Sequence, residues 1–161
     1  MPFPVRKIVS GGQTGADQGG LLAARELGIE TGGVAPHGWL TEDGPQEELL
    51  RSFGLAECEE EGYAARTRQN IALSDGTLLV GAYESGGSKL TYEVAVQMNK
   101  PLFLITYPLN KSDDERRINE FGRWLKDHKI RALNVAGHRE SQSPGIGEFT
   151  RNFLLRALLP W

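Results

Sequence analysis

The stretch VRKIVSGGQTG at residues 5–15 decides the fold prediction, because it joins a short apolar run to a glycine-rich turn. The apolar run ends with Ile8 and Val9, which predicts a short buried strand before the glycines. Farther along, apolar residues recur at helical spacing as far as Leu27, and Gly28 supplies a left-handed stop. This part of the chain therefore predicts a strand, a glycine loop and a helix.

The same order of elements recurs along the chain. Further strands are predicted at residues 29–35, 56–58, 77–80, 102–105 and 132–136. Further helices are predicted at residues 46–53, 63–73 and 90–98, from a capping box at 112–115, and after the polar loop 137–147. Because the connections are too long for hairpins, the pattern predicts an α/β fold, a Rossmann-like three-layer sandwich with a mainly parallel sheet and helices on both faces.

The length and the net charge of the chain limit the number of domains and the kinds of partner that we expect. The chain has 161 residues, of which 39% are hydrophobic, and it contains no internal repeat or linker. Residues 1–161 are therefore expected to form a single ligand-binding domain, in which Trp124 and Trp161 are structural. With 18 basic and 21 acidic residues, the net charge of −3 gives no overall positive field that would attract nucleic acid.

The cysteine content and the hydropathy suggest a cellular location. The sequence contains one cysteine, Cys58, which excludes an intramolecular disulfide and is typical of a reducing compartment. Residues 1–7 lack the apolar stretch of a secretory signal, and no run reaches the ~18 apolar residues that a membrane helix needs. We therefore expect a cytoplasmic protein without a membrane or nucleic-acid partner.

The glycine loop after the first strand is the first candidate ligand site. Its small residues would let backbone amides approach an anion at the start of the next helix. The candidate ligand-binding residues are Ser10, Gly11, Gly12, Gln13, Thr14, Gly15 and Asp17. Asp17 is expected either to cap the helix or to hold a ribose-like hydroxyl. The alternative is that these glycines only make a tight turn.

A second glycine loop precedes the helix predicted at residues 90–98 and is interpreted as another phosphate-binding loop. Its candidate binding residues are Gly86, Gly87, Ser88, Lys89, Thr91 and Glu93. Glu93 is also the best acid–base candidate, although a carboxylate near a helix start commonly stays ionised. The alternative is a solvated loop before a capped helix.

Two other segments offer cations and hydrogen-bonding side chains. The polar loop 137–147 contributes Arg139, Glu140 and Ser141, although the arginine could instead form a surface salt bridge. The helix predicted at 63–73 and the turn after it contribute Arg66, Arg68, Asn70, Ser74 and Asp75, with a solvated charged face as the alternative. Trp39 is expected to stack on a planar heterocycle, with core packing or a subunit contact as the alternative.

Common catalytic motifs do not occur in this sequence. No lysine follows the first glycine loop as in a P-loop, and neither a G-x-G-x-x-G register nor a G-x-S-x-G elbow is present. His37, His128 and His138 lack metal-ligand spacing, so no metal site is predicted.

Several strings together carry a family resemblance that spans nearly the whole chain. They are SGGQTGAD at 10–17, P-x-G-W at 36–39, EDG at 42–44, R-x-x-x-N at 66–70, SDGT at 74–77, GG at 86–87 with Thr91, and NVAGHRES at 134–141. The sequence resembles the molybdenum carrier family, which is similar to the lysine-decarboxylase-like, cytokinin-activating phosphoribohydrolases in a circularly permuted arrangement. Residues 86–93 resemble the P-G-G-x-G-T-x-x-E string of those hydrolases without its proline and third glycine.

The resemblance implies a doubly wound sheet, a homo-oligomer and a site for a phosphorylated or oxyanionic ligand, such as the molybdenum cofactor or molybdate. On this interpretation the chain is a carrier rather than an enzyme, and Arg68 and Arg139 neutralise a molybdopterin-like or nucleotide-like ligand. One alternative is hydrolysis of the N-glycosidic bond of a nucleoside monophosphate, with Glu93 and either Arg66 or Arg68 assisting the ribosyl centre. Another is a sensor of a nucleotide-like ligand.

Overall fold

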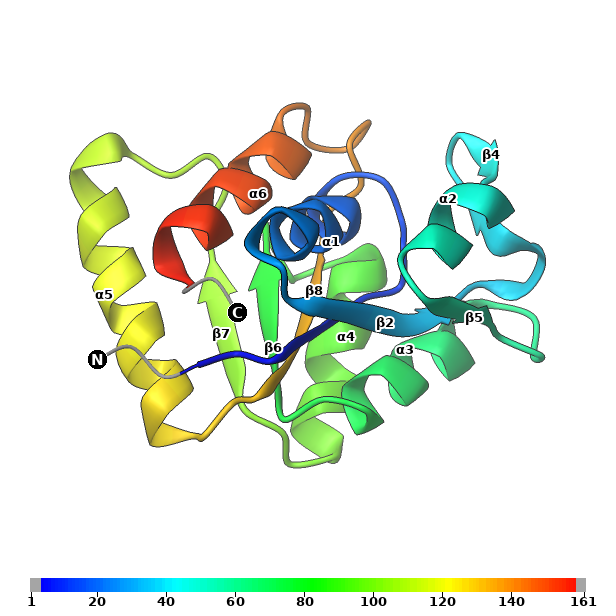
Figure 1. The fold of residues 1–161 in the computed structure, drawn as a ribbon, viewed down its shortest axis with the longest axis horizontal. Helices are drawn as coiled ribbons and strands as arrows, with labels where there is room; N and C mark the ends of the chain where they lie inside the picture. Colours follow the sequence, from blue (N-terminus) through cyan, green and yellow to red (C-terminus); the bar gives the residue numbers. More distant parts are fainter. Residues whose placement is uncertain (1–3, 159–161) are drawn as a thin grey trace.

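A six-stranded parallel sheet forms the centre of the molecule (Figure 1). The computed structural model describes residues 4–158, and the strand order is β5-β2-β1-β8-β6-β7. The strands are β1 (Lys7–Val9), β2 (Glu30–Ala35), β5 (Leu55–Glu57), β6 (Gly76–Val80), β7 (Leu102–Ile105) and β8 (Ala132–Gly137). Every neighbouring pair is parallel. A separate antiparallel pair, β3 (Leu40–Thr41) and β4 (Gly44–Pro45), follows the 3-10 turn η1 (His37–Trp39).

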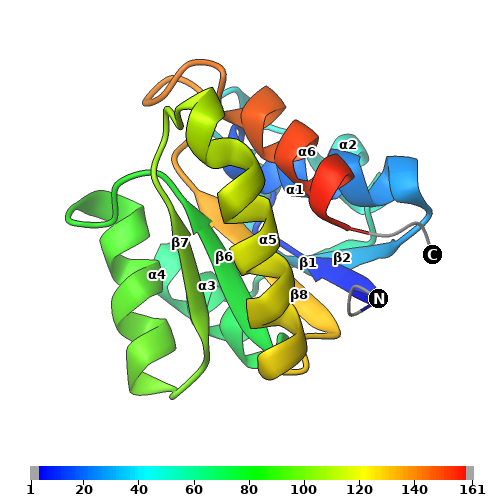
Figure 2. The ribbon, with the colours of Figure 1, turned by 90° about the vertical axis from the view of Figure 1, so that its left-hand side faces the viewer.

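Helices cover both faces of this sheet. They are α1 (Ala16–Leu27), α2 (Glu47–Ser52), α3 (Tyr63–Ala72), α4 (Gly86–Gln97), α5 (Lys111–Asp127) and α6 (Ile146–Ala157). Figure 2 shows α1, α5 and α6 on one face and α3 and α4 on the other, and α2 packs beside β5. The predicted three-layer α/β fold is confirmed. Within residues 4–158, no helix combines the length and the hydropathy needed to cross a bilayer.

The core consists of a large apolar cluster and two smaller ones. The large cluster lies between the sheet and helices α1, α5 and α6, and contains Phe121, Leu133 and Phe153. Each such side chain contributes roughly 1.5–3 kcal/mol when fully buried. Trp124 packs against this cluster, as predicted, whereas Trp161 lies outside the described residues. The smaller clusters lie around α2 and between α3 and α4.

Helix α5 shows why spacing predicted an element but not its start. Phe121 and Leu125 lie one turn apart and are both buried, as the predicted apolar stripe requires. The helix begins after Asn110 without a side-chain cap bond, so Ser112 lies inside the first turn. The predicted capping box is therefore wrong, because a serine there is no longer at the position that reaches the free amides. Helix α4 likewise begins at Gly86 rather than at residue 90.

The strand order creates a crevice at the centre of the sheet. From β1 the chain continues outward to β2 and β5, then builds β6 and β7 on the other side, and finally inserts β8 between β1 and β6. In such sheets, ligands bind beyond the carboxyl ends of the strands where the order reverses. The loops after β1 and β8 therefore flank the expected ligand site.

Candidate functional site

A cavity of about 300 Å³ lies beyond the ends of β1 and β8, at the start of α4. The loop after β1 lines it with Gly11, Gln13 and Asp17, and α3 lines it with Tyr63, Arg66, Thr67 and Asn70. Helix α4 contributes Gly86, Gly87, Ser88, Leu90 and Thr91. Strand β8 and the loop after it contribute Asn134, Ala136, Gly137, Arg139 and Gln142. The structure thus brings all three predicted loops to one hollow.

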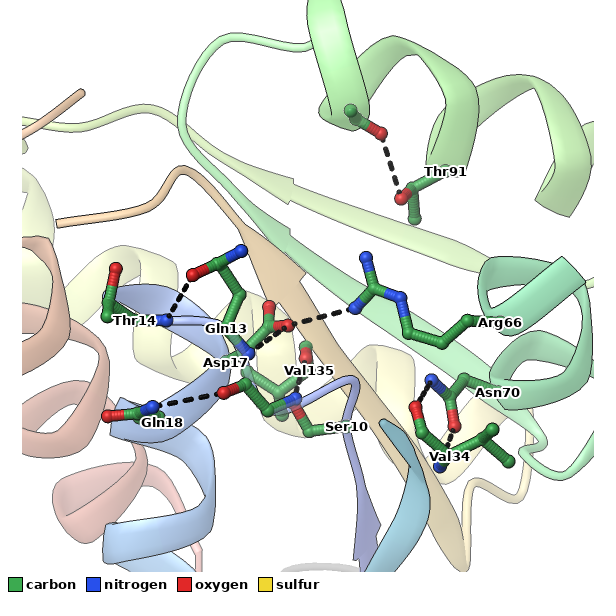
Figure 3. A network of polar contacts seen from close by, with 12 residues as sticks. Ser10, Gln13, Thr14, Asp17, Gln18, Val34, Arg66, Asn70, Thr91 and Val135 are labelled. Carbon is green, nitrogen blue, oxygen red and sulfur yellow. Dashed lines mark hydrogen bonds and ion pairs between the residues drawn. The ribbon is translucent and has the colours of Figure 1, made fainter. Parts of the chain in front are cut away.

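A buried ion pair forms one side of the cavity (Figure 3). Arg66 Nη1 lies 3.5 Å from Asp17 Oδ2, which also accepts a 3.2 Å hydrogen bond from the amide of Gln13. Burial raises the pKa of Asp17 to about 6, although the charge of Arg66 acts in the opposite direction. A carboxyl with a raised pKa beside an arginine in a cavity is typical of a functional site.

Gly11 makes room for the guanidinium of Arg66. A Cβ atom at Gly11 would lie 1.6 Å from Arg66 Nη1, so no larger residue fits while the arginine reaches Asp17. The ring centroid of Tyr63 lies 5.3 Å from Arg66 Cζ, and Arg66 Nε is buried without a hydrogen-bond partner among the described residues. The first of the two glycines therefore leaves the space that the guanidinium of Arg66 occupies.

Most amides of the loop after β1 already have partners inside the protein. The amide of Thr14 donates to Gln13 Oε1 (3.1 Å), and that of Ala16 donates to the carbonyl of His138 (3.1 Å). Ser10 Oγ donates to the carbonyl of Val135 (3.1 Å) and thereby joins β1 to β8. The predicted cradle of free amides is therefore wrong for most of this loop, because side chains and distant carbonyls accept from its amides. Four predicted site residues lie outside the lining: Ser10, Gly12, Thr14 and Gly15.

The start of α4 has free amides. Its N-cap, Ser85, forms no side-chain cap bond, and no acidic residue lies in the first turn. The amides of Gly86, Gly87 and Ser88 therefore begin the helix at the cavity without an intrahelical acceptor. Such a helix terminus attracts anions. Thr91 supports this turn, since its hydroxyl donates to the carbonyl of Gly87 (3.1 Å).

Lys89 and Glu93 lie outside the cavity lining. They are exposed on α4 and face each other, with 3.9 Å between Lys89 Nζ and Glu93 Oε1. Glu93 therefore does not reach the position of an acid–base group in this cavity. Asp17 is the carboxylate that lines it.

Arg139 brings a second positive charge to the mouth of the cavity. Its guanidinium forms no ion pair with any described residue, so the alternative of a surface salt bridge is not observed. Glu140 instead accepts hydrogen bonds from the amides of Gly145 (2.6 Å) and Gly147 (3.1 Å). These bonds hold the loop that carries Arg139.

Glu42 joins the β3–β4 pair to the two loops of the site. Its carboxylate accepts hydrogen bonds from the hydroxyls of Ser141 and Thr14, and from the amide of Ser141 at 3.1 Å. These bonds, that of the Ser141 hydroxyl first, lower the pKa of Glu42. Ser141 therefore fixes the loop and does not line the cavity.

Helical geometry separates the candidates on α3. Arg66 and Asn70 lie four residues apart on the face that lines the cavity, whereas Arg68 is exposed on another face. The Asn70 side chain accepts from the amide of Val34 (2.7 Å) and donates to its carbonyl (3.0 Å), which fixes α3 against β2. The arginine of this helix at the cavity is therefore Arg66 and not Arg68.

Three other candidates lie away from the cavity. Trp39 is buried in the cluster around α2, which matches the alternative of core packing. Ser74 and Asp75 precede β6, at the amino ends of the strands, and Asp75 accepts from the amides of Arg131 and Ala132. The expectation that Ser74 and Asp75 join the ligand edge is wrong, because they enter a strand instead of leaving one.

Some lining residues were missed by the sequence analysis. They are Tyr63, Thr67, Leu90, Asn134, Ala136, Gly137 and Gln142. Asn134 carried a usable signal, since a polar residue inside an apolar strand needs a partner, and it donates to Thr77 Oγ1 (3.2 Å). Among residues 4–158, no three His, Cys, Asp or Glu side chains lie together as a metal site would require.

Comparisons with known proteins agree with this architecture. Residues 8–158 match the family described as Circularly permutated YpsA SLOG family. A crystal structure from Syntrophus aciditrophicus SB, named "Putative molybdenum carrier protein", is 35% identical, with a TM-score of 0.88 over 98% of this chain and 96% of that one. No curated protein matches the chain. The chain belongs to the circularly permuted YpsA family of SLOG proteins.

Proposed function

We propose that this protein binds and carries a small anionic ligand in the cavity between β1, β8 and α4. The leading candidate is the molybdenum cofactor, and another phosphorylated, nucleotide-like ligand is the alternative. The name of the similar Syntrophus protein supports the first candidate. A homo-oligomeric state and a cytoplasmic location stay predictions from the sequence.

One observation carries the proposal: two guanidinium groups and a free helix N-terminus converge on the same cavity. The charged lining residues are Arg66, Arg139 and Asp17, so the lining has a net positive charge when all three are ionised. The amides at the start of α4 add a partial positive charge. Arginine and helix amides are the groups that bind phosphate and similar oxyanions most often.

The volume of the cavity favours an organic ligand. About 300 Å³ is at the lower end of the range of small-molecule sites, roughly 300–1,000 Å³. One water occupies about 30 Å³ in the liquid, so a single tetrahedral oxyanion would fill only a part of this space. A phosphorylated organic molecule fits the volume better.

Calorimetry on purified protein tests the proposal. We expect ribose 5-phosphate, used as a phosphate-ester probe, to bind, and Arg139→Ala to weaken its affinity about tenfold through the loss of a charge-assisted hydrogen bond. Arg68→Ala is the matched control, because this arginine is exposed and outside the lining. Equal effects of the two substitutions, or no heat of binding with the probe, inorganic phosphate or molybdate, would contradict the proposal.

The cofactor itself is tested on protein isolated from its own host. Native mass spectrometry together with elemental analysis for molybdenum should reveal a bound mass that Arg139→Ala diminishes. A phosphorylated compound without molybdenum would favour the nucleotide-like alternative.

A second candidate is hydrolysis of a nucleoside monophosphate, and one observation favours it. The pKa of Asp17, raised by burial to about 6, is close to the value at which a carboxyl acts as an acid or base near neutral pH. Release of free base from nucleoside monophosphates, and its loss in Asp17→Asn, would support this activity.

A further inference from the structure

We propose that Asp17 is the specificity-determining residue of the cavity: it selects anionic ligands that also carry a hydroxyl or N–H donor and disfavours bare oxyanions. The inference rests on the proposed function, because it concerns which anions the same cavity accepts.

One carboxylate oxygen of Asp17 has partners within the protein, and the other can accept a hydrogen bond from a ligand. Oδ2 accepts from the amide of Gln13 and pairs with Arg66, whereas Oδ1 makes no hydrogen bond to any described residue. Oδ1 is also not among the buried atoms that lack a partner, so it is open to the cavity. In Figure 3 this second oxygen points away from both Gln13 N and Arg66.

The charge of Asp17 and its open oxygen affect which ligand groups can lie beside them. Asp17 pairs directly with Arg66, whereas Arg139 forms no ion pair with a described residue and interacts with the carboxylate of Glu42 only at longer range. With a pKa of about 6, Asp17 is ionised at pH 7.5 and repels an oxyanion placed beside it. A hydroxyl or N–H group at the same place would instead donate to Oδ1.

The free amides at the start of α4 lie apart from Asp17. Figure 3 shows the α4 turn that carries Thr91 separated from Asp17, and the free amides of Gly86 and Gly87 belong to that turn. The cavity therefore has an anion end at α4 and an acceptor end at Asp17. A ligand that spans both ends must carry an oxyanion on one side and a donor on the other.

Two neutral hydroxyl groups also line the cavity. Thr67 and Ser88 are more than nine-tenths buried, line the cavity, and make no side-chain hydrogen bond to any described residue. Neither hydroxyl is among the fully buried atoms that lack a partner, so both are open to the cavity and can accept from, as well as donate to, a polyhydroxylated or N–H-bearing ligand.

The test compares ligands that differ in donors and share one anionic group. Calorimetry at pH 7.5 uses ribose 5-phosphate and glycerol 3-phosphate against methyl phosphate, with inorganic phosphate and molybdate as bare oxyanions. We expect at least one hydroxylated ester to bind about tenfold or more tightly than methyl phosphate, because a site built for a donor rejects analogues without it. This ranking is measured on the unsubstituted protein, so it does not depend on the folding of a variant.

Asp17→Asn then assigns the preference to the carboxylate. The substitution removes the charge and should reduce the preference for the hydroxylated ester to about threefold or less, while binding of bare phosphate strengthens. Glu93→Gln is the matched control, since it changes an exposed carboxylate outside the cavity and should leave the ranking unaltered.

Two results separate the inference from the proposed function. If methyl phosphate and ribose 5-phosphate bind equally well and Arg139→Ala weakens both, the role of Asp17 is refuted and the anion site stands. If the preference for the hydroxylated ester persists in Asp17→Asn, another residue binds the donor of the ligand, and the assignment of this role to Asp17 is overturned. If no anion in the panel binds, the proposed function fails and the inference fails with it.

Discussion

Mild acidification should stabilise this protein through Asp17, in the direction opposite to that of most carboxylates. Burial raises the pKa of Asp17 from 3.8 to about 6, with Arg66 opposing the rise. At a pH between these two pKa values, Asp17 binds a proton in the folded state but not in the unfolded state. The free energy of unfolding therefore increases as the pH falls through this range. From these two pKa values, the free energy of unfolding gains about 1 kcal/mol between about pH 7 and about pH 5 from this group alone.

Urea unfolding of the wild type and of Asp17→Asn at both pH values measures this gain. Asparagine keeps the size of the side chain and an acceptor for Gln13, but it takes up no proton in this range. Since other groups also titrate, the informative quantity is the stability difference between the two proteins, which should change by about 1 kcal/mol. Asp43→Asn, an exposed aspartate outside the cavity, controls for the loss of one carboxylate.

A stability difference that is the same at both pH values would refute this reasoning. The carboxyl resonance of Asp17 offers an independent check by NMR, where a titration midpoint near 4 instead of near 6 would show that its burial does not hinder ionisation. Either result would also remove the argument for Asp17 as an acid–base group.

Three substitutions test the packing around the site and the core. Gly11→Ala should weaken binding of ribose 5-phosphate at least about fivefold, because its Cβ displaces Arg66 from Asp17; calorimetry would contradict this if the affinity were unchanged. Gly19→Ala should lower the free energy of unfolding by about 1–3 kcal/mol despite the higher helix propensity of alanine, since its Cβ would lie 2.4 Å from the carbonyl oxygen of Gly147. A gain in urea resistance would be the opposite of this expectation. Phe121→Ala should cost about 3–5 kcal/mol in the same assay, because this ring is fully buried in the large cluster, and a loss below about 1 kcal/mol would disagree with that packing.

Local periodicity was sufficient to predict most of the elements. The apolar run 77–80 coincides with β6, and the stripe that includes Phe121 and Leu125 lies on α5 as expected. These patterns depend on residues within one or two turns of each other, and they are therefore visible in the sequence. The start of α5 was not predictable in this way, because Ser112 is as good an N-cap by residue type as Asn110, which is the N-cap in the structure.

The candidate site was predictable in part. The helical period already separates Arg66 and Asn70 from Arg68, but the sequence does not say which of the two faces meets a cavity. Contact of α3 with β2, through the hydrogen bonds of Asn70 to Val34, decides that Arg66 lies inside. The helix that lines the cavity was therefore predictable from the sequence, whereas the prediction of Arg68 as its ligand-binding arginine was wrong.

The sequence by itself determined the parallel sheet, the order of its helices and the glycine loops at the strand ends. Only the tertiary structure decided which helix start keeps free amides. The amide of Ala16, at the start of α1, donates to the carbonyl of His138, whereas the amides at the start of α4 have no side-chain cap. It also decided that Asp17 and Arg66 meet behind Gly11. The physical reason is that burial and hydrogen-bond partners come from segments far apart in the chain, whereas periodicity and turn chemistry are properties of neighbouring residues.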